Sequence, residues 1–187
     1  SDGLPIMPPT EERVAAFLRY TDRKPEEVLG VLYPDSRAAT IWSIAVNGVM
    51  AGCRPEYMPI LIAIVEGLVD PLTNSFNLGS TTGYDPYLVL SGPIAKQLGF
   101  DASVGSLRPG NQANSSVSRF QRMYLRNVCG YRIPPGAGDK GSIGQSFLVA
   151  LAEDEDGARA IGWPTFAEDR GYASGENIVT VQSVVCI

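Results

Sequence analysis

The stretch of residues 36–69 constrains the fold most, because it is almost entirely apolar and is interrupted by a single cluster of polar residues. A helix drawn over 38–50 would be apolar nearly all round, and a helix over 58–69 would contain one charged residue. A helix that is hydrophobic on every side belongs in a protein core or a membrane. We therefore expect two buried helices, the first capped by Asp35 or Ser36, that meet at a tight corner.

The corner between these helices brings together a thiol, a guanidinium, a carboxylate and a phenol, in Cys53, Arg54, Glu56 and Tyr57. A cysteine that lies beside an arginine and just before a helix start has two influences that lower a thiol pKa. The helix start also offers unpaired backbone N–H groups to an anion. The functional interpretation is a carboxylate or phosphate pocket, in which Arg54 holds the anion and Glu56 or Tyr57 transfers a proton. Cys53 would be a nucleophile or a close-packed wall, and Asn47 would add a polar contact to the substrate.

The same corner also has a purely structural interpretation. Cys53 would be a small buried filler, Arg54 would cap the C-terminus of the first helix, and Glu56 would form a salt bridge at the start of the second. The residue types alone leave both interpretations open.

The remainder of the chain predicts shorter elements around this helix pair. Residues 4–9 should be extended, because their prolines block a helix. We expect one domain over residues 1–187, of the α/β class with α+β as the alternative: helix-rich, with a small sheet and the two buried helices at its centre. Further helices are expected over 11–18 with Thr10 as N-cap, over 25–32, over 94–98 and from Asn111 to Gly130, and strands over 87–90, 147–151 and 178–185.

The helix that begins at Asn111 has two different faces. One carries apolar residues at helical spacing and is expected to face the core, namely Val117, Phe120, Tyr124 and Val128. The other carries Arg119, Arg122 and Arg126, which should form a solvated face or, alternatively, dock an acidic partner.

Two further segments are candidates for substrate contacts. Arg108 and Gly110 lead into a helix start that contains Asn111 and Asn114, which is either an anion cradle or an ordinary N-cap. The loop 81–84 precedes the strand 87–90, and the segment 91–93 follows it; residues at the carboxyl end of a parallel strand often line a binding site, although a turn explains both segments equally well. The loop residues that we expect to contact a substrate are Thr81, Thr82 and Tyr84.

Composition excludes several classes of function. Histidine is absent from the 187 residues, which rules out a Ser-His-Asp or Cys-His arrangement within this chain. No CxxC motif is present, and the acidic run 153–156 lacks the EF-hand spacing, so we expect no metal site. The acidic run is expected to lie on the surface. The net charge of -5 argues against nucleic-acid binding, and no apolar run is long enough for a membrane span.

The cysteines and the N-terminus bear on the compartment. Three scattered cysteines do not make a disulfide framework, which favours a reducing compartment, most simply the cytoplasm. We expect no secretory signal, and we interpret Ser1 as a cloning remnant.

Four segments of the chain resemble a bacterial family, the UGSC-type (seleno)proteins: LPIMPPTEERVAAFL, VNGVMAGCRPEYMPILIAIVEGL, LSGPIAKQLGF and RPGNQANSSVSRFQRMYLRNV. The likeness extends from Leu4 to about Val181, and AGCRPEYMP and PGNQAN are its most specific pieces. Members occur beside, or fused to, a domain with a Cys/Sec-Gly-Ser-Cys motif, which this chain lacks. Where members carry a His before the strand, this sequence has Thr82, Gly83, Tyr84 and Asp85. The resemblance implies a subunit or domain that works with a thiol- or selenol-bearing partner on a small molecule.

Three hypotheses follow for the function. In the first, the chain is a subunit or domain of a heteromeric bacterial enzyme acting on a small anionic organic substrate, with thiol-linked, lyase or hydrolase chemistry shared with a partner subunit. In the second, it is a non-catalytic structural subunit with an obligate interface to a catalytic partner. In the third, it is a stand-alone hydrolase or lyase that uses carboxylates such as Glu56 and Asp85. The sequence identifies no cofactor.

Overall fold

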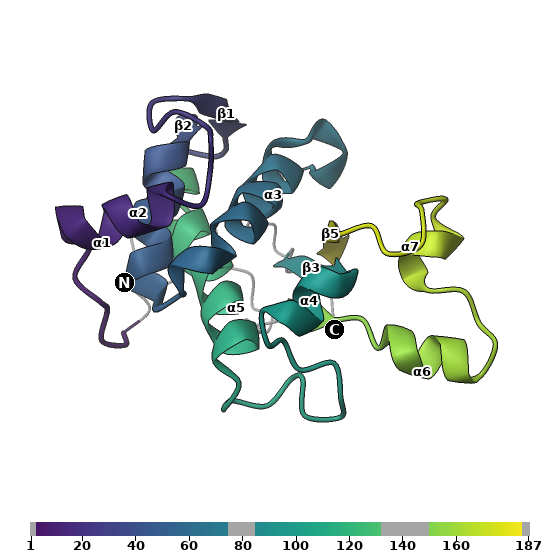
Figure 1. Ribbon diagram of the computed structural model, residues 1–187. Helices are drawn as coiled ribbons and strands as arrows, with labels where there is room; N and C mark the ends of the chain where they lie inside the picture. Colours follow the sequence, from purple (N-terminus) through teal and green to yellow (C-terminus); the bar gives the residue numbers. More distant parts are fainter. Residues whose placement is uncertain (1–2, 75–84, 132–149, 185–187) are drawn as a thin grey trace.

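The computed structural model describes residues 3–74, 85–131 and 150–184 (Figure 1). Over these residues the chain has the expected helix-rich mixed α/β fold, with a two-stranded and a three-stranded sheet. In chain order the helices and strands are α1 (Glu11–Leu18), β1 (Val28–Leu32), β2 (Arg37–Thr40), α2 (Ile41–Ala51), a 3₁₀ turn (Pro55–Tyr57), α3 (Met58–Val69), a second 3₁₀ turn (Pro71–Thr73), β3 (Asp85–Ser91), α4 (Pro93–Gln97), α5 (Gln112–Tyr124), a π-helical turn (Leu125–Cys129), β4 (Ala150–Ala152), α6 (Glu155–Ala160), α7 (Phe166–Asp169) and β5 (Ile178–Val184).

The two apolar helices, α2 and α3, lie at the centre of the fold as the sequence predicts. Most of their side chains belong to one continuous hydrophobic core. Helix α2 ends at Gly52, whose φ of 81° lies in the left-handed region that glycine adopts without strain. Its N-cap is Thr40, which forms a capping box with Ser43, so the expected cap at Asp35 or Ser36 was wrong.

A β-hairpin replaces the helix expected over 25–32. Strands β1 and β2 pair antiparallel, with Val28 opposite Thr40 and Leu32 opposite Arg37. The β-branched residues of this segment favour a strand once a partner strand lies beside it, and that partner comes from the residues just before α2. Gly30 lets the hairpin approach α3, because a Cβ atom there would lie 2.9 Å from the Cβ of Val69.

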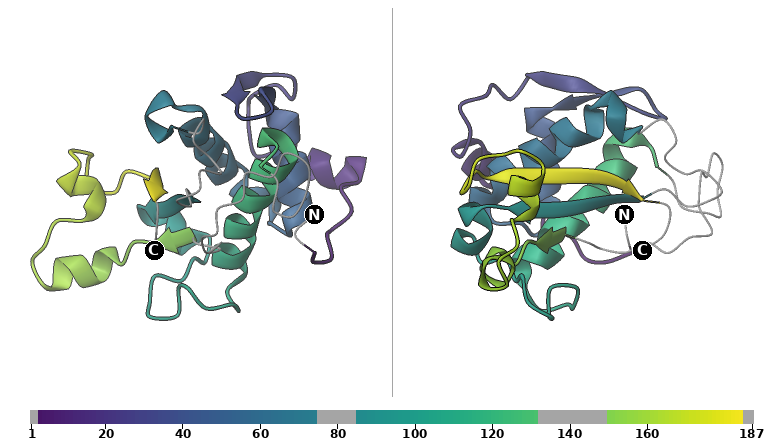
Figure 2. Two further views of the ribbon diagram at one scale, coloured as in Figure 1. Left: turned by 180° about the vertical axis from the view of Figure 1, so that it is seen from behind. Right: turned by 90° about the vertical axis from the view of Figure 1, so that its right-hand side faces the viewer.

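The three-stranded sheet has the order β4-β3-β5, with β3 parallel to β4 and antiparallel to β5 (Figure 2). The expected strand over 87–90 is confirmed, and the one expected over 178–185 is found as β5 in residues 178–184, with residue 185 outside the described part of the chain. The strand expected over 147–151 is found as β4 in residues 150–152, and residues 147–149 lie outside the described part of the chain. Helix α3 packs on β5, and Gly67 permits this contact, because a Cβ atom there would lie 2.5 Å from Val181 Cγ2.

Helix α5 crosses the body of the molecule and continues into the π-helical turn, which ends at Gly130. Its expected core stripe is confirmed. The expected solvated arginine face is wrong, because Arg122 is only 5% exposed and its guanidinium lies 6.0 Å from the ring centroid of Tyr131. Arg119 donates to the carbonyl of Pro5 at 2.8 Å, so the N-terminal segment covers this side of α5. Other parts of the chain therefore cover the arginine side of α5 at Arg122 and, in part, at Arg119.

Two segments lie outside this packed body. Residues 3–9 form no helix or strand, as their prolines predict, and run along α2, where the Met7 amide donates to Met50 O at 3.4 Å. Residues 153–177, which join β4 to β5, carry α6 and α7 and project away from the helical body (Figure 1). In the described residues, no helix is long and apolar enough to cross a membrane.

Candidate functional site

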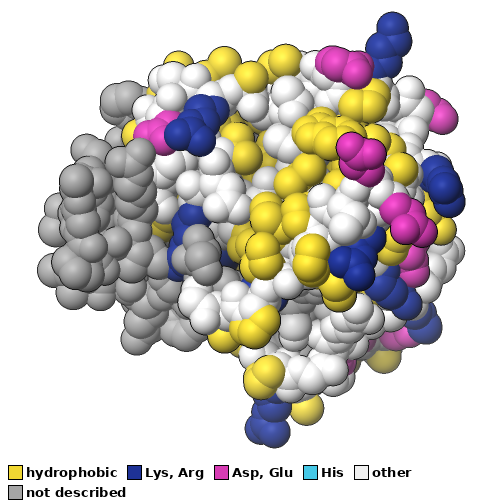
Figure 3. Space-filling model, turned by 90° about the vertical axis from the view of Figure 1, so that its left-hand side faces the viewer, with side chains coloured by type: hydrophobic (Ala, Val, Ile, Leu, Met, Phe, Trp, Pro, Cys, Tyr) yellow, Lys and Arg dark blue, Asp and Glu magenta, His cyan; other side chains and the backbone are white. Residues whose placement is uncertain are grey.

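The corner at Cys53 borders a cavity of ≈ 250 Å³, which we call the Cys53 cavity. Helix α1 and the N-terminal segment form its outer side, and Figure 3 shows the face of the molecule that carries them, where hydrophobic side chains gather between charged ones. The N-terminal segment, α1, the end of α2 with the corner, and the start of α5 all line this cavity. They meet there because α1 packs against α2 and the first turn of α5 lies beside the corner. The side chains that line the cavity include those of Met7, Arg13, Phe17, Val49, Cys53 and Gln112.

The thiol of Cys53 is buried at the back of this cavity and is only 9% exposed. It donates to the carbonyl of Ser116 at 3.3 Å. Burial raises its pKa to about 12, while Ser116 and the more distant charge of Arg119 act in the opposite direction. The expectation of a lowered thiol pKa was therefore wrong, because desolvation outweighs the nearby positive charge. Cys53 is a close-packed, protonated wall of the cavity.

Arg54 turns away from the Cys53 cavity. Its Nη2 donates to the carbonyl of Leu98 at 2.8 Å, its Nε lies 3.1 Å from Glu56 Oε1, and its guanidinium stacks 4.8 Å from the ring centroid of Tyr57. The arginine therefore ties the corner to the end of α4 and does not cap α2. Tyr57 is buried, and burial raises the pKa of its hydroxyl, so it stays protonated at neutral pH.

Asn47 points into a polar cluster beside the π-helical turn. Its amide nitrogen donates to Ser43 O at 2.8 Å, and its oxygen accepts from Asn127 Nδ2 at 2.7 Å. The hydroxyls of Ser43 and Tyr124 lie 2.9 Å apart in the same cluster. These contacts join α2 to the end of α5 and account for both polar ends of the Asn47 amide.

Asn111 and Asn114 hold neighbouring segments of the chain in place. Asn111 caps α5 and donates to Gly99 O at 2.9 Å. Asn114 is buried, accepts from the Asp101 amide at 2.8 Å, and donates to Asp101 O at 3.0 Å and Ala150 O at 2.9 Å. Of the two interpretations of this helix start, the structure supports the N-cap, extended by a clamp on β4.

Neither Arg108 nor Gly110 lines the Cys53 cavity. Arg108 is exposed, and its amide donates to Gly105 O at 2.8 Å. Gly110 has a φ of 136° and precedes the N-cap of α5. The predicted contacts in the loop before β3, Thr81, Thr82 and Tyr84, lie outside the described residues, as does the side chain of Asp85.

A second cavity, of ≈ 340 Å³, lies at the carboxyl ends of the parallel strands β3 and β4, and we call it the strand-end cavity. It is bounded by the segments 92–103 and 152–156. The segment 91–93 does follow a parallel strand, as the sequence analysis anticipated. The opposite wall carries the acidic run 153–156, in which Asp154 and Asp156 are exposed as the sequence predicts, whereas Glu153 and Glu155 are half-buried, which the sequence did not predict.

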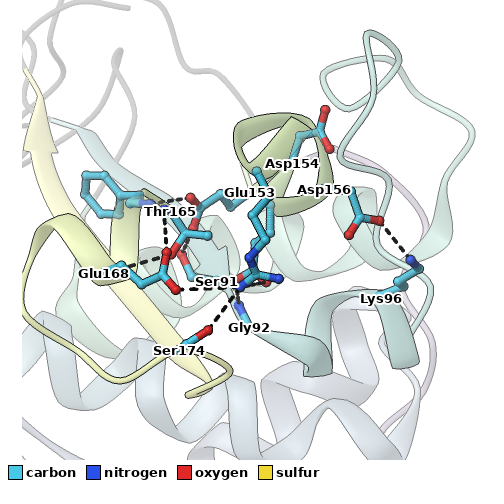
Figure 4. A network of polar contacts seen from close by, with 12 residues as sticks. Ser91, Gly92, Lys96, Glu153, Asp154, Asp156, Thr165, Glu168 and Ser174 are labelled. Carbon is cyan, nitrogen blue, oxygen red and sulfur yellow. Dashed lines mark hydrogen bonds and ion pairs between the residues drawn. The ribbon is translucent and has the colours of Figure 1, made fainter. Parts of the chain in front are cut away.

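Two carboxylates of the acidic run, Glu153 and Glu155, are tied to the end of β3 (Figure 4). The Ser91 hydroxyl donates to Glu153 Oε2 at 2.6 Å, and the Gly92 amide donates to Glu155 Oε1 at 2.7 Å. Glu153 also accepts from the amide of Phe166 at the start of α7. Two of the four carboxylates therefore join β3, β4 and the projecting segment, and the distance along the chain between residues 91 and 153 hides this contact from sequence analysis.

The remaining charges of the strand-end cavity lie at its rim. Lys96 Nζ is 3.0 Å from Asp156 Oδ2, and both side chains are exposed. Asp101 accepts from the Ser103 amide at 2.8 Å, and hydrogen bonds from Ser103 lower the pKa of this carboxyl. Within residues 3–74, 85–131 and 150–184, no group of three or more His, Cys, Asp and Glu side chains is arranged to hold a metal ion.

No protein-family model, curated protein or solved structure matches this chain. The resemblance to the UGSC-type family therefore rests on the sequence segments quoted above.

Proposed function

We propose that this chain is a small-molecule-binding subunit or domain of a heteromeric enzyme, and that it binds a small organic acid in the Cys53 cavity. The observation that carries the proposal is the composition of the cavity wall. Apolar side chains, among them Met7, Phe17 and Val49, surround one guanidinium, one amide and one protonated thiol. Small-molecule sites commonly combine such apolar walls with a few placed polar groups.

Arg13 takes the role that the sequence suggested for Arg54. It extends from α1 at the rim of the cavity, and its Nη1 donates to Pro8 O at 2.9 Å, which orients the guanidinium while using one of its five N–H donors. A guanidinium binds a carboxylate through charge-assisted hydrogen bonds. Gln112, whose Nε2 is 3.4 Å from Gly52 O, adds an amide on the opposite side.

The chemistry of the reaction would then be shared with a partner. The chain has no histidine, and burial raises the pKa of Cys53 and Cys129, the two cysteines in the described part of the chain, to about 12, so neither of these thiols is a nucleophile at neutral pH. A general base or an activated thiol or selenol would come from the second subunit. The resemblance to the UGSC-type family supports this division.

Titration of the full chain with isovalerate, followed by amide NMR, tests the binding site. We expect saturable shifts at Gly52, Cys53 and Gln112, and a loss of affinity in Arg13→Gln. Arg19→Gln is the matched control, because it removes the same charge from the exposed end of α1. Equal losses in both variants, or no saturable shift, would contradict the site. Full turnover by the purified chain alone would contradict the shared chemistry.

A structural subunit is the second candidate, and one observation favours it. The hairpin β1–β2 and the start of α2 expose large apolar side chains, namely Val28, Val31, Tyr33 and Trp42. Exposed apolar groups that cluster on one face are typical of protein interfaces. This candidate predicts that the chain binds its partner equally well when Arg13→Gln has removed any binding of isovalerate.

A further inference from the structure

The strand-end cavity has the position of a ligand site in an α/β protein. Strands β3 and β4 are parallel neighbours, with Leu88 beside Ala150 and Leu90 beside Ala152, so their carboxyl ends open at the same edge of the sheet. In open sheets of this kind, ligands bind in the crevice outside the carboxyl ends of the strands. No residue lines both this cavity and the Cys53 cavity, so the two are separate.

The walls of the cavity are held in place before any ligand arrives. Glu153 and Glu155 attach one wall to the end of β3, at 2.6 Å from Ser91 Oγ and 2.7 Å from the Gly92 amide. On the other side, buried Asn114 clamps the backbone of Asp101 through two hydrogen bonds of 2.8 Å and 3.0 Å. A cavity built on fixed walls loses less conformational entropy when a ligand binds.

The interior and the rim differ in chemistry. The interior is apolar, with the nearly buried ring of Phe100 and the side chains of Ala95 and Ala152. The rim is strongly acidic, since five carboxylates and a single amine line the cavity. That amine, Lys96, is already paired with Asp156. The field at the mouth therefore favours a positive charge, and the interior favours a hydrocarbon or an aromatic group.

The arrangement of the carboxylates decides between a metal ion and an organic cation. A divalent metal needs several oxygens that converge within about 2.0–2.6 Å of one point. Among the described residues, the carboxylates of this rim do not form such a group. Four of the five carboxylates are engaged with Ser91, Gly92, Lys96 and Ser103, and the fifth, that of Asp154, accepts from the amide of Gly157.

We infer that the strand-end cavity binds an organic cation, an amine whose apolar or aromatic body enters the cavity while its ammonium group lies among the carboxylates of the rim. The volume of the strand-end cavity, ≈ 340 Å³, is sufficient for a small arylalkylamine. The apolar interior supplies the contact area, and the rim selects the charge of the ligand. The inference is independent of the acid site at Cys53.

The test is a titration of the full chain with 2-phenylethylamine at low ionic strength and about pH 7, where the amine is cationic. We expect saturable amide shifts at Gly92, Ala102 and Ser103, with a dissociation constant of about 1 mM, as is usual for a ligand of about nine non-hydrogen atoms. The comparison ligand is 3-phenylpropionate, which has a similar body and the opposite charge. It should give no saturable shift at these amides.

Two variants and one control locate the site. Asp156→Lys should weaken binding by about three- to tenfold at low salt, because it reverses an exposed charge at the mouth. Asp169→Lys makes the same change on α7, away from the cavity, and should have little effect. Ala102→Leu fills the cavity without a change of charge and should abolish the shifts.

Three results would overturn the inference. The first is the absence of saturable shifts at these amides up to about 10 mM amine, a range that covers weak fragment binding. The second is equal binding of the amine and the carboxylate. The third is equal weakening by Asp156→Lys and Asp169→Lys, which would mean that the amine responds only to the overall charge. Should Ala102→Leu fail to fold, the comparison of the two lysine variants still decides.

Discussion

The buried thiol at the corner of α2 and α3 makes a quantitative prediction about alkylation. The pKa of Cys53 is about 12, against an ordinary value of 9.0. At about pH 8, a thiol with the ordinary pKa of 9.0 is about one-tenth thiolate. A thiol with a pKa of about 12 is thiolate in about one molecule in ten thousand at the same pH. Since only the thiolate reacts, the ratio predicts labelling of Cys53 about a thousandfold slower in the folded chain than in the unfolded chain.

The assay is a pulse of iodoacetamide, applied to the folded chain and to the chain in denaturant, with the extent of labelling at Cys53 measured by peptide mass spectrometry. Mapping by peptide separates Cys53 from the other cysteines without a mutation. The pH dependence supplies a second readout. Below about pH 9 the rate of labelling of Cys53 in the folded chain should rise tenfold per pH unit, because the thiolate fraction does. Labelling through rare opening of the fold is also slow, because the open population is small.

Fast labelling would refute this reasoning. A rate at Cys53 within about tenfold of the unfolded chain at neutral pH would mean that burial does not keep the thiol protonated, and a rate above that of the unfolded chain would mean that the thiol is activated as the sequence first suggested. In either case the argument that burial dominates the electrostatics of the corner would be wrong, and in the second case the corner would be a nucleophilic site. Slow labelling agrees with a protonated wall of the cavity.

Two further predictions concern stability. Asn114→Ala removes three hydrogen bonds to Asp101 and Ala150 and leaves buried backbone groups unpaired, so chemical denaturation should show a loss of about 3–5 kcal/mol; a loss below about 1 kcal/mol would show that water replaces the amide. Burial raises the thiol pKa values of Cys53 and Cys129 in the folded state, so above about pH 9 the folded chain keeps two protons that the unfolded chain releases. The free energy of unfolding should therefore fall with rising pH in that range, by up to about 1.4 kcal/mol per pH unit for each thiol. In Cys53→Ala the contribution of one thiol should disappear from that slope, and an unchanged slope would contradict the assignment.

The first turn of α5 lies between the two cavities. Gln112 lines the Cys53 cavity, and Asn114, two residues later, clamps Asp101 at the edge of the strand-end cavity. Arg54 connects the same regions through Leu98, the residue that ends α4. The segments AGCRPEYMP and PGNQAN, which are far apart in the sequence, are therefore neighbours in the fold.

Local signals in the sequence were sufficient for much of the fold. The apolar residues within 58–69 predicted a buried helix, and Thr10, Asn111 and Gly130 marked helix ends correctly, because capping depends on residues within one turn. The strand 87–90 was also visible from its short apolar run. Each of these features depends on neighbours in the chain.

The errors arose where distant segments decide the outcome. The segment 25–32 has helical spacing, yet it pairs with 37–40 and packs on Val69 through Gly30. Arg122 has the spacing of a surface stripe, yet its side chain is buried. Hydrogen bonds and burial supplied by remote residues outweigh local propensity in both cases.

For the functional residues, the sequence by itself determined which chemical groups exist and which are missing: one thiol at a polar corner, an acidic run, and no histidine. Only the tertiary structure decided what those groups do. It buried Cys53 and so raised the pKa of its thiol, engaged Arg54 with Leu98, and brought Glu153 to Ser91 across the ends of two strands. The physical reason is that the desolvation of a group and the walls of a cavity depend on every segment packed nearby. No local sequence pattern specifies which distant segments those are.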